Sequence, residues 1–267
     1  MDSEHHEEQE PAMTFLEHLE ELRWTLVKSI VALILAMGLC LVFATKIMSF
    51  LQAPLFQVLE KRDQNPEDFL LSLNPVDPLT LSLQIGFFAG FIVAFPLIAY
   101  FIGSFVNPAL KKQERYLLVP TFLAGLLLFI GGAAFCYCLL LPQALRFFIE
   151  WSELYGLRPQ WPFTQYVGFV LQMLIAFGLS FELPLLIAIL SKLGFVHSRD
   201  LGKYRRHAVV GIVIFCACVT PTSDPFTLGM MFGPMYLLYE GSILISRFIE
   251  WDRRKRLVKE GLMDDLD

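Results

Sequence analysis

Residues 166–192 read YVGFVLQMLIAFGLSFELPLLIAILSK, a long apolar run that a single acid, Glu182, interrupts. About 20 apolar residues in an α-helix cross the hydrocarbon core of a bilayer, so this run predicts a membrane-spanning helix. A carboxylate inside such a span is costly and usually faces other helices or a water-filled space. We therefore expect Glu182 to be the polar point of a groove within the membrane. The alternative is a protonated carboxyl group that only hydrogen-bonds to a neighbouring helix.

The rest of the chain has the same apolar character. Hydrophobic residues make up 55% of the 267 residues, and the mean hydropathy is +0.56. The apolar residues gather in several runs of about 20 residues, which indicates an all-α polytopic membrane protein and excludes a soluble globular class. No metal and no cofactor are expected, because the cysteines lie in apolar runs without the spacing of metal ligands. These cysteines are Cys40, Cys136, Cys138, Cys216 and Cys218.

The apolar runs predict six transmembrane helices within a membrane domain at residues 14–248. A short amphipathic helix at residues 14–23 is expected to lie on the membrane surface, because apolar residues recur there at helical spacing between charged ones. Residues 1–13 are expected to be a flexible acidic tail, and residues 249–267 a charged tail. The spans are expected at residues 24–44, 78–103, 116–141, 166–192, 208–219 and 226–246, with longer loops at residues 45–77 and 142–165.

The last two spans are expected to be short. The run at residues 208–219 stops at Thr220-Pro221, and about 12 residues at the helical rise cover only about 18 Å of a hydrocarbon core of about 30 Å. Two arrangements fit this pattern: a re-entrant hairpin, or two short spans that thin the bilayer locally. We prefer the two short spans, although the distribution of charge fits both arrangements.

The positions of the lysines and arginines predict the orientation of the chain. Of the 21 Lys and Arg residues, 16 lie on the side of the N-terminus, and the others are Lys46, Lys61, Arg62, Arg146 and Arg158. Cytoplasmic loops of membrane proteins carry the excess of basic residues. We therefore expect both termini in the cytoplasm.

Several short motifs, in this order and spacing, resemble the TatC family, the membrane receptor subunit of the twin-arginine protein translocase. The resemblance covers roughly residues 14–248, and the combination is far more specific than any one motif. The motifs are HLEELR (18–23), QAPL (52–55), AFPLIAY (94–100), NPAL (107–110), AFGLSFELP (176–184), TPTSDPF (220–226) and PMYLLYE (234–240). The chain departs from the usual family pattern at Thr25, Phe101 and Thr227-Leu228.

The resemblance implies a concave, glove-like bundle of six helices in the cytoplasmic (inner) membrane of a bacterium or archaeon. Such a protein binds the twin-arginine signal peptides of folded cargo and is not an enzyme. With TatA- and TatB-type single-span partners, in a multimeric receptor complex, it exports that cargo by using the proton-motive force. Its other partner is membrane lipid, and no nucleic acid is expected.

The same resemblance implies roles for individual residues. An arginine pair is recognised by carboxylates that accept the planar guanidinium in a bidentate way, and Glu21 and Glu114 match the family's acidic residues for that role. Arg23 and Arg115 are expected to position these acids. Tyr137 and Thr220 match a polar group that contacts partner subunits at the far ends of the third and fifth spans. Architectural roles are expected for Pro54, Pro96 and Phe105.

Two other classes of protein were weighed against this one. An intramembrane enzyme is disfavoured, because the sequence contains neither an HExxH nor a GxSxG motif and no pair of membrane aspartates. A secondary ion or solute transporter that uses Glu182 and Glu240 is the stronger alternative, since the last two apolar runs are short and broken by Gly and Pro. Against it, the two halves of the chain show no internal repeat.

Overall fold

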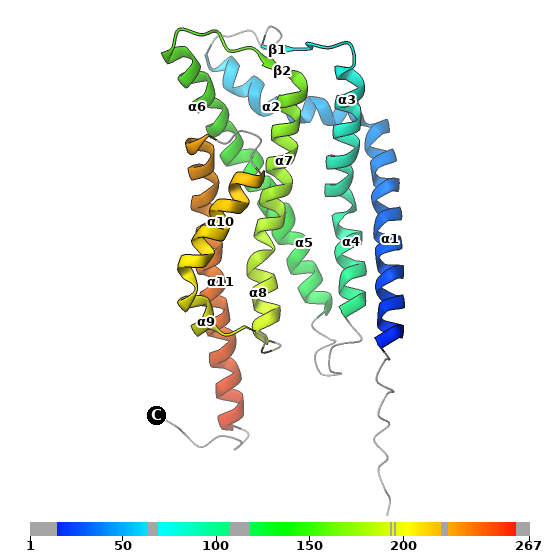
Figure 1. The fold of residues 1–267 in the computed structure, drawn as a ribbon, viewed down its shortest axis with the longest axis vertical. Coiled ribbons are helices and arrows are strands. Elements are labelled where there is room, and N and C mark those ends of the chain that lie inside the picture. The colour runs from blue at the N-terminus through cyan, green and yellow to red at the C-terminus, as the bar shows by residue number, and fades with distance from the viewer. Residues whose placement is uncertain are drawn as a thin grey trace, which may run out of the picture.

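The computed structural model describes residues 15–62, 69–106, 118–192, 194, 196–219 and 224–259. Long helices run side by side along one axis, and short elements cap one end of the bundle (Figure 1). We call the end at which α1 (Phe15–Val42) begins the near end; the end of α11 (Pro225–Lys259) lies there too. The opposite end, where α2 (Ala44–Glu60) lies, is the far end.

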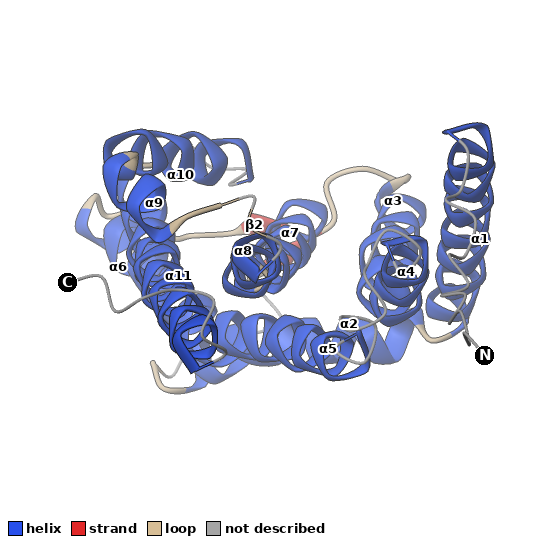
Figure 2. Cartoon of the chain, turned by 90° about the horizontal axis from the view of Figure 1, so that it is seen from below, coloured by secondary structure: helices blue, strands red, loops and turns tan. Residues whose placement is uncertain are grey.

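The remaining elements include two short strands and two π-helical turns, η2 and η5, that lie within longer helices. In chain order they are β1 (Leu70–Leu71), α3 (Asp77–Gln84), η2 (Ile85–Ala89), α4 (Gly90–Val106), α5 (Leu118–Phe135), η5 (Cys136–Leu140), α6 (Leu141–Leu154), β2 (Trp161–Pro162), α7 (Phe163–Phe181), α8 (Leu183–Lys192), α9 (Ser198–Lys203) and α10 (Arg205–Val219). Seen along the bundle, α1 and α4 lie at one edge, α9, α10 and α11 at the other, and α7 and α8 between them (Figure 2).

The prediction of an all-α polytopic membrane protein is confirmed. Within the described residues, five helical segments are long and apolar enough to cross a membrane. They are Leu16–Val42, Asp77–Phe105, Val119–Leu154, Phe163–Lys192 and Pro225–Asp252. The helix α10 has 15 residues, which is fewer than the roughly 20 that a straight span needs.

The first helix corrects the prediction of a separate surface helix at residues 14–23. Phe15 to Val42 form one α-helix of 28 residues, so residues 15–23 continue the axis of the span. The physical reason is that no proline or glycine occurs between Phe15 and Gly38, so nothing interrupts the backbone hydrogen bonds between the amphipathic and the apolar part.

The prediction of a loop at residues 45–77 is wrong for its first half, because α2 is a helix of 17 residues. Its buried residues Leu51, Leu55, Val58 and Leu59 recur at helical spacing and form one face in the core. Pro54 lies inside the helix and is buried on the same face. A proline outside the first turn is typical of a loop, and here tertiary packing overrides that signal.

The third apolar run also continues further than predicted. The helical segment from Val119 ends at Leu154 rather than at residue 141, and therefore takes up much of the predicted loop at residues 142–165. Pro142 lies directly after the π-helical turn η5 and in the first turn of α6, where a missing backbone N–H costs little. The α6 face with Leu141, Leu145 and Ile149 is buried.

The last helix is longer than predicted at its C-terminal end. The prediction ended this span at residue 246, but α11 runs through Pro234 and continues to Lys259, a length of 35 residues. At the helical rise it extends about 52 Å, more than the roughly 40–45 Å of a whole bilayer. The end of α11 therefore projects beyond the other helices at the near end (Figure 1).

The centre of the bundle is α7, whose buried residues run along most of its length. Two glycines let α5 and α7 approach closely. A Cβ atom on Gly132 of α5 would lie 2.5 Å from the carbonyl oxygen of Phe177, and one on Gly178 of α7 would lie 2.7 Å from the ring of Phe129. Membrane helices commonly associate through such small residues, because contact between backbones replaces the hydrophobic drive that lipid does not supply.

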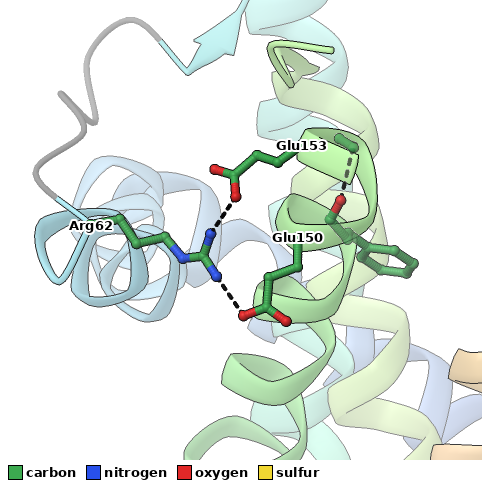
Figure 3. Close-up of polar contacts among 5 residues, drawn as sticks. Arg62, Glu150 and Glu153 are labelled. Atoms are coloured by element: carbon green, nitrogen blue, oxygen red, sulfur yellow. Dashed lines mark hydrogen bonds and ion pairs between the residues drawn. The ribbon is translucent and has the colours of Figure 1, made fainter. Parts of the chain in front are cut away.

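The far end is closed by contacts between segments that are distant in sequence. Strand β1 pairs in parallel with β2, with Leu70 opposite Trp161. Arg62, at the end of α2, donates to Glu150 at 2.5 Å and to Glu153 at 2.8 Å, both on α6 (Figure 3). The two carboxylates are 61% and 41% exposed, so each ion pair adds little stability, and the two together connect the end of α2 to α6.

Candidate functional site

A carboxylate with a free acceptor lies at the near end of α1. His18 stacks on Phe105 of α4, with ring centroids 4.4 Å apart, and its Nδ1 lies 4.0 Å from Oε2 of Glu21. That oxygen is buried and has no hydrogen bond to any described residue. The carboxylate oxygen therefore lies beside the stacked rings of His18 and Phe105. This arrangement suits a guanidinium group, which both donates to carboxylates and stacks on aromatic rings.

Of the other residues expected at this site, the structure describes Arg23 only. Arg23 is exposed, and its guanidinium carbon lies 5.4 Å from the centroid of the neighbouring Trp24 ring. Glu114 and Arg115 lie outside the described residues. Their segment connects the end of α4 to the start of α5, and both of these helix ends lie at the near end, as Glu21 does (Figure 1).

Glu182 lies at a break between two helices. The helix α7 ends at Phe181 and α8 begins at Leu183, so Glu182 joins them. Its backbone N–H donates to the carbonyl of Leu179 at 3.1 Å, and its own carbonyl accepts from Leu186 at 2.9 Å. The missing N–H of Pro184 removes one hydrogen bond from this turn, which explains why the helix breaks here.

The carboxyl group of Glu182 lies against α5 at Gly125. A Cβ atom at Gly125 would lie 3.2 Å from Oε2 of Glu182 and 3.5 Å from Oε1, so the absence of a side chain makes room for the acid. Oε1 is buried and has no hydrogen bond to any described residue. The side chain is half-buried overall. The geometry therefore leaves an acceptor that water or a bound polar group can use.

Glu240, by contrast, has partners for both of its oxygens. Arg205 of α10 donates to Oε2 at 2.8 Å, and the Tyr236 hydroxyl donates to Oε1 at 2.9 Å. The Tyr239 hydroxyl adds a bond of 2.8 Å to the carbonyl of Leu201 in α9. These contacts connect α9 and α10 to α11. Glu240 itself connects α10 to α11 through its ion pair with Arg205.

Two buried polar atoms lie at the other end of the α10–α11 pair. Asp224 caps α11, because its Oδ1 accepts from the backbone N–H of Thr227 at 2.8 Å. Its Oδ2 and the Oγ1 of the fully buried Thr227 have no hydrogen bond to described residues. Asp224 belongs to the TPTSDPF motif and Thr227 to a departure from the family pattern, but the sequence predicted no role in a site for either residue. An Asp followed by Pro at the start of an apolar run is the capping pattern that marks the start of α11. Thr220, which was included, lies outside the described residues.

Tyr137 contacts the helix that contains Pro54, and Pro96 and Phe105 lie elsewhere. The Tyr137 hydroxyl donates to the carbonyl of Phe50, the residue four positions before Pro54. Pro96 lies inside α4, and Phe105 supplies the ring on which His18 stacks.

These features define a polytopic helical membrane protein with unpaired acidic oxygens at its near end and at a helix break. The chain belongs to the TatC family, since the model of that family, described as Sec-independent protein translocase protein (TatC), matches residues 17–234. This confirms the resemblance found in the sequence. The match also indicates a family of protein translocase components rather than a family of catalytic enzymes.

Relatives and a solved structure agree with this assignment. The chain is 33% identical to the Sec-independent protein translocase protein TatC of Aquifex aeolicus over 251 residues, which cover 93% of this chain and 100% of the relative. It is 33% identical to TatC of Koribacter versatilis over 245 residues, 91% of this chain and 89% of the relative. A crystal structure of the twin arginine translocase receptor TatC superposes with a TM-score of 0.79 at 34% identity, covering 88% of this chain and 100% of the other.

Proposed function

We propose that this chain is the receptor subunit of a twin-arginine translocase and binds the arginine pair of the signal peptides of folded cargo. The proposal is supported by the solved relative, which is described as a twin arginine translocase receptor and matches this fold over its whole length. With other Tat components it exports that cargo across the cytoplasmic membrane of a bacterium or archaeon. The energy comes from the proton-motive force.

The observation that carries the proposal is the acceptor at Glu21. A buried carboxylate oxygen without a hydrogen-bond partner costs stability unless a ligand satisfies it. One arginine of the signal peptide donates to this oxygen and packs on the ring pair of His18 and Phe105. In this proposal Glu114, in the segment after α4, accepts from the second arginine. Arg23 and Arg115 are proposed to position these acids.

The orientation of the chain follows from its basic residues. Both the start of α1 and the end of α11 lie at the near end, where the basic side of the sequence falls, so we place this end in the cytoplasm. In this orientation α10 is a sixth, short span. At 15 residues it extends about 22 Å, and a bilayer of about 30 Å must thin locally around it.

Partner subunits of the TatA and TatB type are proposed to contact the far end of α10 and α11. There α10 exposes an apolar face, with Val210 and Ile214 each 57% exposed. The single-span helix of a partner subunit would pack on this face. Thr220 and Tyr137 are proposed to contact partner subunits as well, as the family resemblance implies. The Tyr137 hydroxyl already donates to the carbonyl of Phe50.

Glu182 is proposed to act after binding. Its free oxygen at a helix break can hold water or a polar group of the passing peptide within the membrane, which lowers the local barrier to transport. The transporter alternative required Glu182 and Glu240 to act together. Since Glu240 is held by Arg205 and Tyr236, the structure favours the translocase.

Site-specific photocrosslinking tests the proposal. A photoreactive residue is placed beside each acid, at position 22, 113 or 183, so that the acid itself is kept. Each protein is combined with a folded cargo that carries a twin-arginine signal peptide, and with the same cargo carrying a Lys-Lys pair. Crosslinks from positions 22 and 113 that need the arginine pair would support the site. Equal crosslinking to both cargoes would contradict it, and solute flux through vesicles that contain this chain alone would favour the transporter.

A further inference from the structure

A groove of about 550 Å³ follows the seam between α1 and α4. Its lining on α1 recurs every three or four residues from Trp24 to Leu39, so the groove runs along one face of that helix. The lining on α4 comes from the facing stretch, Val93 to Phe101. None of the acids considered above contributes to it.

The groove has a floor of small residues and walls of large ones. Ala32 and Ala36 are 8% exposed and Ala94 is fully buried, whereas Leu35 and Leu97 are 69% and 52% exposed on either side. These small residues are buried because α1 and α4 pack directly against each other there.

Contacts at both ends of the seam hold the two helices together. A Cβ atom at Gly90 would lie 2.8 Å from the Cα of Met37, and the stacked rings of His18 and Phe105 join the helices towards the near end. The groove is therefore part of the rigid packing of α1 on α4.

The chemistry of the lining is apolar with a single cation. Lys28 is the only charged residue among the described residues that line the groove. It lies one turn from Trp24, on the side away from the near end, because α1 begins at Phe15. Lys and Trp side chains at this depth extend to the headgroup layer, where a lysine attracts the phosphate of an anionic lipid.

We propose that this groove binds one acyl chain of an anionic phospholipid, whose headgroup phosphate lies on the Lys28 ammonium. From Lys28 to Leu39 the groove extends about 16 Å at the helical rise, close to the roughly 15 Å depth of one leaflet. A partner helix is the other possible occupant, and the test below distinguishes it from a lipid. The proposal does not depend on the binding of signal peptides.

The test uses the full chain, purified and reconstituted in nanodiscs that contain equal amounts of phosphatidylglycerol and phosphatidylcholine. Each lipid is supplied in turn with a photoreactive diazirine near the end of one acyl chain, and adducts are located by mass spectrometry of peptides. We expect adducts enriched on the lining residues of α1 and α4, with phosphatidylglycerol preferred over phosphatidylcholine about fivefold.

Two variants distinguish binding of the lipid headgroup from binding of the acyl chain, and each has a control. Lys28→Gln should abolish the preference for phosphatidylglycerol but keep the adducts in the groove, and Lys46→Gln, a lysine outside the groove, should change neither. Ala36→Leu fills the floor and should remove the adducts, whereas Ala134→Leu, at an exposed alanine of α5, should not.

Three outcomes would overturn the proposal. The first is a uniform spread of adducts over all exposed helix faces, and the second is an unchanged lipid preference in Lys28→Gln. The third is loss of the adducts when partner subunits are added, which would mean that a helix occupies the groove. A circular dichroism spectrum and a thermal unfolding curve for each variant ensure that only folded protein is compared.

Discussion

The hydroxyl of Tyr137 donates a hydrogen bond of 2.7 Å to the carbonyl oxygen of Phe50, the acceptor that Pro54 deprives of its helical donor. The two rings also stack, with centroids 4.4 Å apart and planes at 2°. The Tyr166 hydroxyl donates to the next carbonyl, that of Leu51, at 2.7 Å. Two tyrosines from η5 and α7 thus hold a proline-containing helix at the far end of the bundle.

The first prediction concerns this bond. Tyr137→Phe removes the donor and leaves the Phe50 carbonyl unsatisfied, so the free energy of unfolding should fall by about 1 kcal/mol. In a Pro54→Ala background the backbone N–H at position 54 can bond to Phe50, and Tyr137→Phe should then cost much less. Unfolding in detergent measures all four proteins of this cycle. Tyr100→Phe, at an exposed tyrosine, is the control, and an equal cost of Tyr137→Phe in both backgrounds would refute the explanation.

The second prediction concerns recognition. Glu21→Lys replaces the acceptor by a cation and should reduce binding of a twin-arginine peptide at least tenfold, since a lost charge-assisted pair is worth about 1.5–3 kcal/mol. The double variant with Glu114→Lys should abolish capture while the protein remains folded. Fluorescence anisotropy of a labelled signal peptide measures the affinity.

Glu20→Lys is the matched control for this prediction, because Glu20 is the exposed neighbour of Glu21 on the same helix. It introduces the same charge at nearly the same depth. If Glu20→Lys weakens binding as much as Glu21→Lys does, a general electrostatic effect explains the result and the specific acceptor does not.

The sequence alone predicted the class of fold and marked Glu182 as a polar point inside a span, because long apolar runs and an acid inside one of them are strong local signals. It did not predict that the helix breaks there. It failed where packing overrides a local signal. Pro54 and Pro142 indicated loops, but a tyrosine donor and a π-helical turn keep both inside helical segments. The free oxygens of Asp224 and Thr227 could not be predicted, since whether a polar atom has a partner depends on the packing of distant segments.

The third prediction separates a structural role of Glu240 from a role in an ion pathway. Glu240→Gln keeps the bond from Tyr236 but weakens the pair with Arg205, so it should lower stability by no more than about 1 kcal/mol and leave cargo export near normal. Export into inverted membrane vesicles and thermal unfolding measure the two effects. Loss of export at unchanged stability would instead place Glu240 on an ion pathway.

The fourth prediction concerns Glu182. Glu182→Ala should impair export more than it impairs binding of the signal peptide, because the residue lies at the break between α7 and α8 rather than at the near end. Glu182→Gln keeps the ability to hydrogen-bond and should be milder. Equal loss in both variants would show that ionisation matters. Normal export by Glu182→Ala would return this residue to a purely structural role.

The last prediction tests the position of the Glu182 carboxyl group through its neighbour on α5. A Cβ atom at Gly125 would lie 3.2 Å from Oε2 and 3.1 Å from a methyl carbon of Leu185, so Gly125→Val must displace the acid from its place. We expect Gly125→Val to reduce export as Glu182→Ala does, with peptide binding kept, and to add little to the effect of Glu182→Ala when both are combined. Gly131→Val is the matched control, because a Cβ atom at Gly131 on the same helix meets nothing within 4 Å. Additive losses in the double variant would mean that Gly125 acts through the packing of α5 on α7 and not through the carboxyl group.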